Sequence, residues 1–347
     1  DIIEAALAAR GGLLLADSRE EAVEFANRYA PEHLLLLVAP VNADRAWERF
    51  RDNGYDREPE FHYRLLPLDP DLLKRRLYDV RLEEIDDPAA FSILRDKREE
   101  LDRQISLLSE RNTAGFLPGS VRLFGPIRPA LLDRARDILE HTPPPTAGGE
   151  QRGETMGAQA FADLARAEFE HYRSVHPDFR SEIQVRPDLV GLMVSSGRLL
   201  IGSRLSLRPG RVDALLQHEV GTHVLTYVNG AAQPFLQLSR GFADYDELQE
   251  GLGVLAEYLV GGLDRGRMRL LAARVVAVQA VIDGAGFLDT FGLLHRDLGF
   301  RPRTAYDIAT RVHQSGGFTR DIIYLRGLLG VVEHLRGGAA IAPPYVG

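Results

Sequence analysis

The 347-residue chain contains no cysteine. This absence excludes disulfide bonds, thiolate zinc sites, iron-sulfur clusters and a cysteine nucleophile. Any bound metal ion must therefore be held by histidine and carboxylate side chains. Long apolar runs are missing too, since the longest, Leu270–Ile282, is interrupted by Arg274 and Gln279 and falls short of the roughly 20 residues that span a membrane. We expect no membrane partner and a cytoplasmic location.

Lysine is almost absent, because Lys74 and Lys97 are the only two. The 42 basic residues are therefore nearly all arginine, and they are scattered among 50 acidic residues that give a net charge of −8. A nucleic-acid partner needs a concentrated basic face, so we expect none. The 45% hydrophobic content is ample for a folded core.

The pattern of the chain changes three times along its length. Residues 1–40 read as a small α/β unit, with a helix from about Ser18 to Tyr29 and a buried strand at Leu34–Val38. A polar-faced helical region is expected next, then a linker rich in proline and glycine, and finally the domain that carries the chemistry. The predicted boundaries are 1–40, 41–142, 143–157 and 158–347.

The fold class expected from these patterns is α+β and mainly helical. Three short strands, at Ile183–Val185, Leu192–Ser195 and Leu199–Ser203, are predicted around a hairpin turn at Ser196-Gly197. Apolar residues recur with helical period elsewhere. We expect helices over Asp69–Tyr78, Ala89–Leu108, Pro129–Leu139, Ala158–Val175, Arg211–Tyr227, Glu247–Val260, Arg265–Ile282, Thr304–His313 and Thr319–Arg336.

The segment from His218 to His223 is an HExxxH motif, one residue longer than the HExxH of zinc peptidases. On a regular helix, residues five apart point about 140° away from each other, so the two histidines could not converge on one ion. A π-helical turn would bring them to one side, and such turns are frequent at functional sites. Gly221 is a plausible place for the distortion. The motif therefore predicts a zinc site formed by a distorted helix.

A third ligand is needed, and Glu250 is the best candidate. It lies in a stretch whose other residues are core-seeking, where an unpaired carboxylate would be costly to bury. Glu257, seven residues later and near the same helical face, is either a rival ligand or a carboxylate that supports the ligands. Asp244 and Asp321 are further candidates for orienting the imidazoles. The remaining histidines lack ligand spacing, and we interpret them as surface or structural residues.

Four separated motifs resemble those of the flavohaemoglobin expression-modulating QEGLA motif proteins. They are the helix motif His218–His223, Asn229-Gly230 with Gln233-Pro234, Gln249-Glu250-Gly251-Leu252, and Gly317-Phe318-Thr319-Arg320-Asp321-Ile322-Ile323-Tyr324-Leu325-Arg326-Gly327. That family is similar to the microtubule-associated tyrosine carboxypeptidases, and the resemblance runs from about residue 40 to the end. Position 253 is glycine where the family motif ends in alanine, a departure expected to affect only local helix stability.

The resemblance implies a zincin-like metallopeptidase domain with a small β-sheet and a helical N-terminal region. It places a zinc ion on His218, His223 and Glu250, with Glu219 as the catalytic glutamate. Hydrolysis would then follow when Glu219 takes a proton from the attacking water. The expected activity is that of a carboxypeptidase acting on the C-terminal tail of a peptide or protein.

A carboxypeptidase also needs a cation for the terminal carboxylate of its substrate. Arg320, Arg311 and Arg326 are the candidates for this substrate-binding role, and Tyr324 could donate a hydrogen bond to the oxyanion. Which of the arginines would serve stays open at the level of sequence.

Residues 1–40 resemble a fragment of histidinol dehydrogenase, through Ala22–Leu34 and its Glu32-His33 pair. The rest of that enzyme has no counterpart here, so we interpret both residues as non-catalytic. Two alternatives to the peptidase follow from these observations. One is a regulatory or binding protein whose zinc is structural, and the less favoured one is a protein related to histidinol dehydrogenase.

Overall fold

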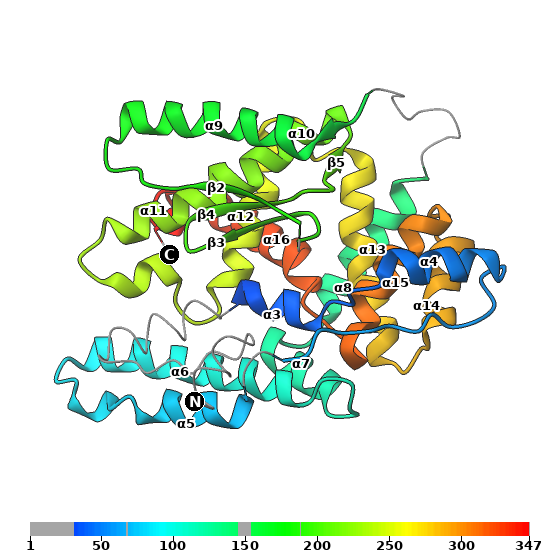
Figure 1. Ribbon diagram of the computed structural model, residues 1–347, viewed down its shortest axis with the longest axis horizontal. Coiled ribbons are helices and arrows are strands. Elements are labelled where there is room, and N and C mark those ends of the chain that lie inside the picture. The colour runs from blue at the N-terminus through cyan, green and yellow to red at the C-terminus, as the bar shows by residue number, and fades with distance from the viewer. Residues whose placement is uncertain (1–30, 67–68, 145–153, 188, 347) are drawn as a thin grey trace, which may run out of the picture.

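A computed structural model describes residues 31–66, 69–144, 154–187 and 189–346 (Figure 1). The predicted helix at Ser18–Tyr29 and most of the predicted 1–40 unit lie outside these residues, as does most of the predicted 143–157 linker. The described chain is mainly helical with two small sheets, which confirms the α+β class. None of its helices combines the length and apolarity needed to cross a membrane.

Six α-helices of the described residues precede the predicted linker. The expected strand at Leu34–Val38 is wrong, because these residues lie in helix α3. Leu34 and Val38 are four residues apart, so a helix brings both onto one face, where they pack with Phe116 and Phe318. The helices are α3 (Pro31–Val38), α4 (Ala43–Asp52), α5 (Pro70–Asp79), α6 (Pro88–Ser109), α7 (Phe116–Phe124) and α8 (Pro129–His141), with a short 3₁₀ turn, η1, at Leu82–Glu84.

Proline punctuates this region in the way that helix starts favour. α5, α6 and α8 each have proline in the first turn, where the missing N–H group has no partner to lose. Asp69 and Asp87 cap α5 and α6 by accepting hydrogen bonds from the backbone. The predicted helices over 69–78, 89–108 and 129–139 are therefore confirmed to within about two residues.

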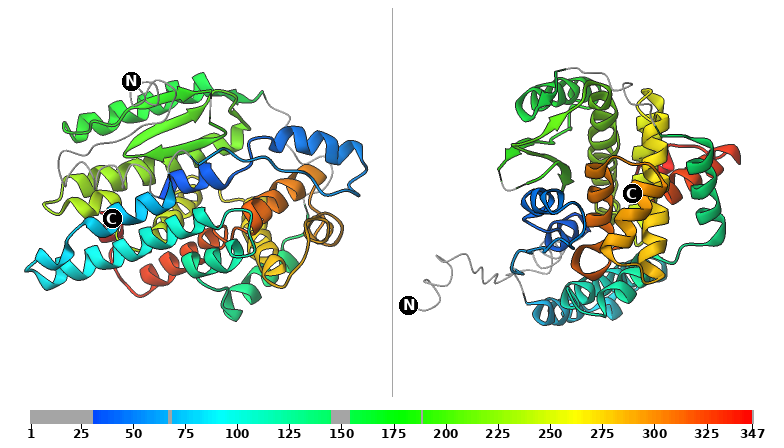
Figure 2. Two further views of the ribbon diagram at one scale, coloured as in Figure 1. Left: turned by 60° about the horizontal axis from the view of Figure 1, so that its bottom comes forward. Right: turned by 90° about the vertical axis from the view of Figure 1, so that its right-hand side faces the viewer.

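A three-stranded sheet has the order β2-β4-β3, with β2 (Ile183–Arg186) parallel to β4 (Arg198–Gly202) and β3 (Leu192–Ser195) antiparallel to it. The predicted turn is present: Ser196 and Gly197 have φ of 49° and 73°, as two-residue hairpins require. Helix α9 (Ala158–Val175) lies along this sheet (Figures 1 and 2). A second sheet pairs β1 (Met156–Gly157) with β5 (Ser206–Leu207).

The remaining helices form the body that carries the candidate site. One continuous helical segment runs from Pro209 to Ala231, as predicted over 211–227, and α12 and α13 fall where helices were expected. The elements are α10 (Pro209–His218), η2 (Glu219–Val224), α11 (Leu225–Ala231), η3 (Leu236–Arg240), α12 (Tyr245–Leu259), α13 (Arg265–Ile282), α14 (Phe287–Gly292), η4 (Leu293–Asp297), α15 (Pro302–His313), η5 (Gln314–Gly316), α16 (Ile322–Arg336) and η6 (Pro343–Tyr345).

Helices α12 and α16 approach each other closely, because two glycines face each other. A Cβ atom on Gly251 would lie 2.3 Å from the carbonyl carbon of Gly327, and one on Gly327 would lie 2.1 Å from the carbonyl oxygen of Glu247. The absence of side chains at this crossing lets the two backbones touch. Glu250 of α12 is thereby held against the polar start of α16.

The largest hydrophobic cluster draws on both halves of the chain. Phe50 of α4 and Leu131 of α8 belong to the same cluster as Leu252 of α12 and Ile323 of α16. A second cluster joins α9, the sheet and α10. The helical N-terminal region thus supports the helices of the site directly. The predicted division at residues 143–157 stays a prediction.

Candidate metal centre

The HExxxH motif sits on a π-helical turn, as its spacing predicted. Residues Glu219–Val224 form this turn between α10 and α11, and Gly221 lies within it. The wider turn compensates for the extra residue, so the imidazole rings of His218 and His223 lie 5.1 Å apart between centroids. Two potential nitrogen ligands therefore face the same space.

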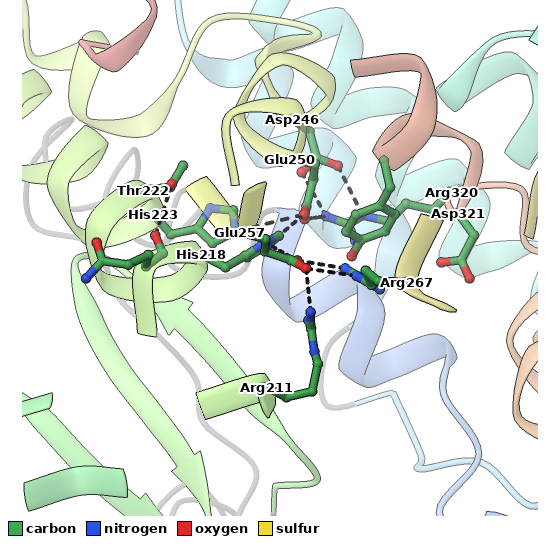
Figure 3. A network of polar contacts seen from close by, with 12 residues as sticks. Arg211, His218, Thr222, His223, Asp246, Glu250, Glu257, Arg267, Arg320 and Asp321 are labelled. Carbon is green, nitrogen blue, oxygen red and sulfur yellow. Dashed lines mark hydrogen bonds and ion pairs between the residues drawn. The ribbon is translucent and has the colours of Figure 1, made fainter. Parts of the chain in front are cut away.

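Glu250 of α12 completes a group of three. Its Oε2 atom lies 3.2 Å from Nε2 of His218 and 3.9 Å from Nε2 of His223 (Figure 3). One ligand atom from each of the three residues falls within 4.8 Å of the others. The structure thus brings together the three residues predicted from the sequence. This group is called the metal triad below.

The donor set fits a divalent transition metal. His218 and Glu250 are each only 5% exposed, so their polar atoms converge in a region where water is nearly excluded. Two imidazole nitrogens and one carboxylate oxygen are the protein ligands that open, catalytic zinc sites use. Burying a carboxylate opposite two imidazoles is costly unless a cation or a proton lies between them.

Glu257 supports His218 from behind. Its Oε1 lies 3.0 Å from Nδ1 of His218, the nitrogen that faces away from Glu250, and its side chain is 0% exposed. Arg211 and Arg267 donate to the same carboxylate at 2.8 to 2.9 Å (Figure 3). The geometry thus decides between the two predicted roles: Glu257 holds an imidazole through its second nitrogen.

The same contacts shift the pKa values of Glu257 and His218. Burial raises the pKa of Glu257, but hydrogen bonds from His218 and Arg267 outweigh it and hold that pKa well below its usual range. Burial lowers the pKa of His218, whereas its bonds to Glu250 and Glu257 outweigh burial and raise the pKa to about 10. The carboxylates of Glu250 and Glu257 thus favour a positive charge on or beside the His218 ring.

Asp321 and Asp244 were candidates for orienting the imidazoles, and the structure gives that position to Glu257 instead. Asp321 accepts two hydrogen bonds from Arg311, at 2.7 and 2.5 Å, and lies 3.4 Å from Arg274. Asp244 immediately precedes α12, with a φ of 62°. In the part of the chain that the structure describes, neither aspartate bonds to His218 or His223.

The predicted catalytic glutamate, Glu219, follows His218 directly on the π-helical turn. Glu219 is half-buried as a residue, and none of the described residues hydrogen-bonds to its carboxylate. Burial raises the pKa of Glu219, and the imidazoles of His223 and His218 only partly offset this. A carboxylate without a partner, next to the metal triad, is free to accept a proton.

Arg320 forms ion pairs with Glu250 of the triad and with Asp246. Its Nη2 donates to Oε1 of Glu250 at 2.8 Å and to Asp246 at 2.8 Å, and its Nη1 lies 3.1 Å from the hydroxyl of Tyr324. Tyr324 is thereby held next to Glu250, and burial raises its pKa, so it keeps its proton. Tyr324 is placed where a hydrogen-bond donor could serve the site.

The other two candidate arginines are also bound to carboxylates. Arg311 forms a two-point ion pair with Asp321, and Arg326 donates to Glu247 at 2.7 Å, at the start of α12. Neither lies against the metal triad in the described structure. The substrate-binding roles of Arg320, Arg311 and Arg326 stay predictions, although all three charges are already neutralised.

Gly253, where the family motif ends in alanine, lies against the imidazole ring of His218. A Cβ atom at this position would lie 2.6 Å from Cε1 and 2.8 Å from Nδ1 of His218. The expectation that this residue affects only helix stability is therefore wrong. Position 253 sets how closely α12 approaches the imidazole, because the ring occupies the space that a methyl group would need.

A cavity of about 90 Å³ opens beside the triad. Its wall includes His223, so anything bound there lies next to the candidate ligands. Most of the rest comes from β3 and the β3–β4 turn, α6, α11, η3 and α12. Its polar and aromatic lining includes Lys97, Glu100, Ser195, Ser196, Thr226, Tyr227, Ser239, Arg240, Phe242, Tyr245, Asp246 and Gln249.

Sequence reasoning missed Arg240 of this cavity. It is half-buried on η3, in the stretch between the HExxxH and QEGLA motifs, and no charge pattern marks it in the sequence. Its proximity to His223 depends on the chain reversing between α11 and α12. Only the folded arrangement could reveal it.

Comparison with known proteins shows the family of the chain. No curated protein matches the chain. The family model for microtubule-associated tyrosine carboxypeptidase matches residues 48–343, a span that contains the triad, Glu219 and the cavity. The name of that family describes a peptidase that removes C-terminal residues, so carboxypeptidase-type activity is indicated. The chain belongs to the microtubule-associated tyrosine carboxypeptidase family.

Proposed function

We propose that this chain is a zinc-dependent carboxypeptidase with a zincin-like catalytic domain, in which Glu219 is the general base. The observation that carries the proposal is the contrast between neighbours: His218 is bound on both nitrogens, whereas Glu219 beside it has no partner among the described residues. The family match supports carboxypeptidase chemistry independently.

His218, His223 and Glu250 would hold the metal, and Glu257 would fix the orientation of the His218 ring through Nδ1. When bound, zinc supplies a Lewis acid that polarises a carbonyl and lowers the pKa of water. The donor set of two histidines and one carboxylate is that of known catalytic zinc peptidases.

Glu219 takes a proton from the attacking water while the water oxygen bonds to the scissile carbonyl carbon. When the C–N bond breaks, the same carboxyl passes the proton to the leaving amine. The hydroxyl of Tyr324, held by Arg320 at 3.1 Å, donates to the oxygen on which negative charge develops. The leaving product is the C-terminal residue of a peptide or protein tail.

The number of ligands favours catalysis over a structural site. Structural zinc sites are closed by four protein ligands, whereas catalytic sites keep a position open. Three residues form the only such group within the described chain. The dehydrogenase-related alternative depends on residues 1–40, and residues 1–30 lie outside the described structure.

The test combines metal analysis with hydrolysis of N-terminally blocked peptides, read by mass spectrometry. The wild type should contain one zinc ion per chain and release the C-terminal residue. Glu219→Gln should keep the zinc and lose roughly 10³-fold in rate, the scale of general-base catalysis. Glu333→Gln on the exposed face of α16 is the matched control and should behave as wild type.

Two results would refute the proposal. One is a purified wild type that neither contains nor binds zinc. The other is a Glu219→Gln protein that hydrolyses the peptides as fast as the wild type does.

A further inference from the structure

One basic side chain in the wall of the cavity beside the metal triad, Arg240, has no acidic partner among the described residues. Four charged side chains besides His223 line it. Lys97 is paired with Glu100 at 3.0 Å, and Asp246 is paired with Arg320 at 2.8 Å. Arg240 forms no ion pair with any acidic group of the described residues. Arg240 is therefore the cation of the wall whose guanidinium is not engaged in an ion pair with a described carboxylate.

Arg240 is held in place by neutral contacts from two sides. Its Nη1 donates to Oγ of Ser196 at 2.8 Å, and its guanidinium carbon lies 5.6 Å from the ring centre of Tyr227. A guanidinium has five N–H donors, so several remain after the bond to Ser196. The contacts fix its plane without neutralising its charge, which is the arrangement that suits a planar anion.

The β3–β4 turn is built around this contact. Gly197 has a φ of 73°, and a Cβ atom there would lie 2.2 Å from Cδ1 of Tyr227. The turn can therefore rest directly on the Tyr227 ring, which places the hydroxyl of Ser196 against Arg240. Contacts from the β3–β4 turn and from α11 thus position the guanidinium of Arg240, which lies on η3, at the cavity.

The size of the cavity limits what Arg240 can bind. Its volume of about 90 Å³ is several times the roughly 10 to 15 Å³ that one enclosed water needs, so it has room for about one residue. His223 and Arg240 line the same cavity, so a residue bound here would lie against both. A planar anion one residue beyond a scissile bond is a terminal carboxylate.

We propose that Arg240 binds the C-terminal carboxylate of the substrate, so that the residue to be removed occupies this cavity. This inference rests on the proposed carboxypeptidase function and adds the residue that would restrict it to chain ends. It differs from the arginines selected by sequence, since Arg320, Arg311 and Arg326 each already pair with a carboxylate.

The test measures binding as well as hydrolysis. The probes are an acetylated pentapeptide ending in tyrosine with a free carboxylate, and the same peptide with a C-terminal carboxamide. Their affinities are measured by calorimetry on zinc-loaded Glu219→Gln protein, which turns over too slowly to consume them. The acid should bind about 100-fold more tightly than the amide, as expected for one or two charged hydrogen bonds.

Adding Arg240→Ala should bring the affinity for the acid down to that for the amide, while the amide is bound as before. Arg240→Lys should retain part of the preference, because it keeps the charge but loses the planar fork. Arg265→Ala, on the exposed start of α13, is the control and should keep the full preference.

Equal affinity for acid and amide in the protein with Arg240 intact would overturn the inference. So would an unchanged preference in the Arg240→Ala protein. If the wild type hydrolyses neither peptide while the preference for acid depends on Arg240, the carboxylate site stands and the proposed hydrolysis fails. The two outcomes are therefore separable.

Discussion

Arg320 binds one of the two carboxylate oxygens of Glu250 and leaves the other facing His218. Nη2 of Arg320 donates to Oε1 at 2.8 Å, while Oε2 faces Nε2 of His218 at 3.2 Å. One oxygen is anchored and the other is left for a metal, so that Glu250 would be a one-oxygen ligand in the proposed site. Asp246 binds the same guanidinium and fixes it from the other side.

Replacing Arg320 should therefore weaken metal binding without removing a ligand. We expect Arg320→Met to lower zinc affinity by about 10- to 100-fold, the usual effect of losing a partner of a metal ligand. Arg326→Met is the matched control, because it breaks another α12–α16 ion pair, with Glu247, away from the triad. Chelator competition measures both. Equal losses of affinity in the two variants would contradict the positioning role.

Glu257 should act on the metal through the other nitrogen of His218. Glu257→Gln keeps the shape of the side chain but removes the charge that faces His218, Arg211 and Arg267. We expect zinc affinity to fall by about 10- to 100-fold and stability by about 3 to 5 kcal/mol, since buried cations lose their partner.

A matched variant separates these two effects. Glu100→Gln also removes a buried carboxylate from an ion pair, with Lys97, but it makes no contact with the triad. It should lower the free energy of unfolding in denaturant titrations while zinc affinity stays within about threefold of wild type. A Glu257→Gln protein that matches Glu100→Gln in zinc affinity would show that Glu257 is merely structural.

An alanine at the glycine contact between α12 and α16 should change the free energy of unfolding by more than helix propensity alone would. Gly251→Ala would place Cβ 2.3 Å from backbone atoms of Gly327, which cannot rotate away. We expect a loss of about 2 to 3 kcal/mol in the free energy of unfolding. Gly330→Ala on α16 has open space within 4 Å and should instead gain up to about 1 kcal/mol. Stabilisation by both alanines would show that the backbones are not in contact.

Local spacing allowed the central part of the site to be predicted from sequence. The HExxxH interval required a π-helical turn if the histidines were to converge, and the turn is present at Glu219–Val224. Glu250 was found because a carboxylate in an apolar helical pattern needs a partner. Both arguments concern residues within one element, where sequence distance determines spatial relation.

Contacts between elements could not be predicted in that way. Arg320 and Arg326 lie just before and on α16, but their partners Asp246, Glu247 and Glu250 are on α12. Arg311 of α15 pairs with Asp321 just before α16. Nothing in the periodicity shows which carboxylates face these arginines. Arg240 was missed for the converse reason, because what distinguishes it is that none of the described carboxylates pairs with it.

The fold shows the same division. Long amphipathic helices were predicted to within a few residues, because their period is repeated several times. The apolar run at Leu34–Val38 is too short to separate a buried strand from a helix, and it proved to be α3. The two-residue strands β1 and β5 have no pattern at all and are defined only by their pairing.

His313 should make stability depend on pH apart from the metal site. Burial lowers its pKa to about 4, while nearby Asp289 only partly opposes this. In the unfolded chain a histidine titrates near 6.5. Between these values the unfolded state binds more protons, so stability is complete above pH 6.5 and is lost as the pH falls towards 4.

The variant His313→Gln should remove that dependence. Glutamine can still bond to Thr290, which lies 2.8 Å from Nε2 of His313, but it does not titrate. The difference in unfolding free energy between wild type and variant should shift by up to about 3 kcal/mol in favour of the variant from pH 7 to pH 4. Thr290→Val, which keeps the imidazole, should show a difference from wild type that hardly changes with pH. Because every other titrating group is shared, parallel pH curves for wild type and His313→Gln would disprove the assignment.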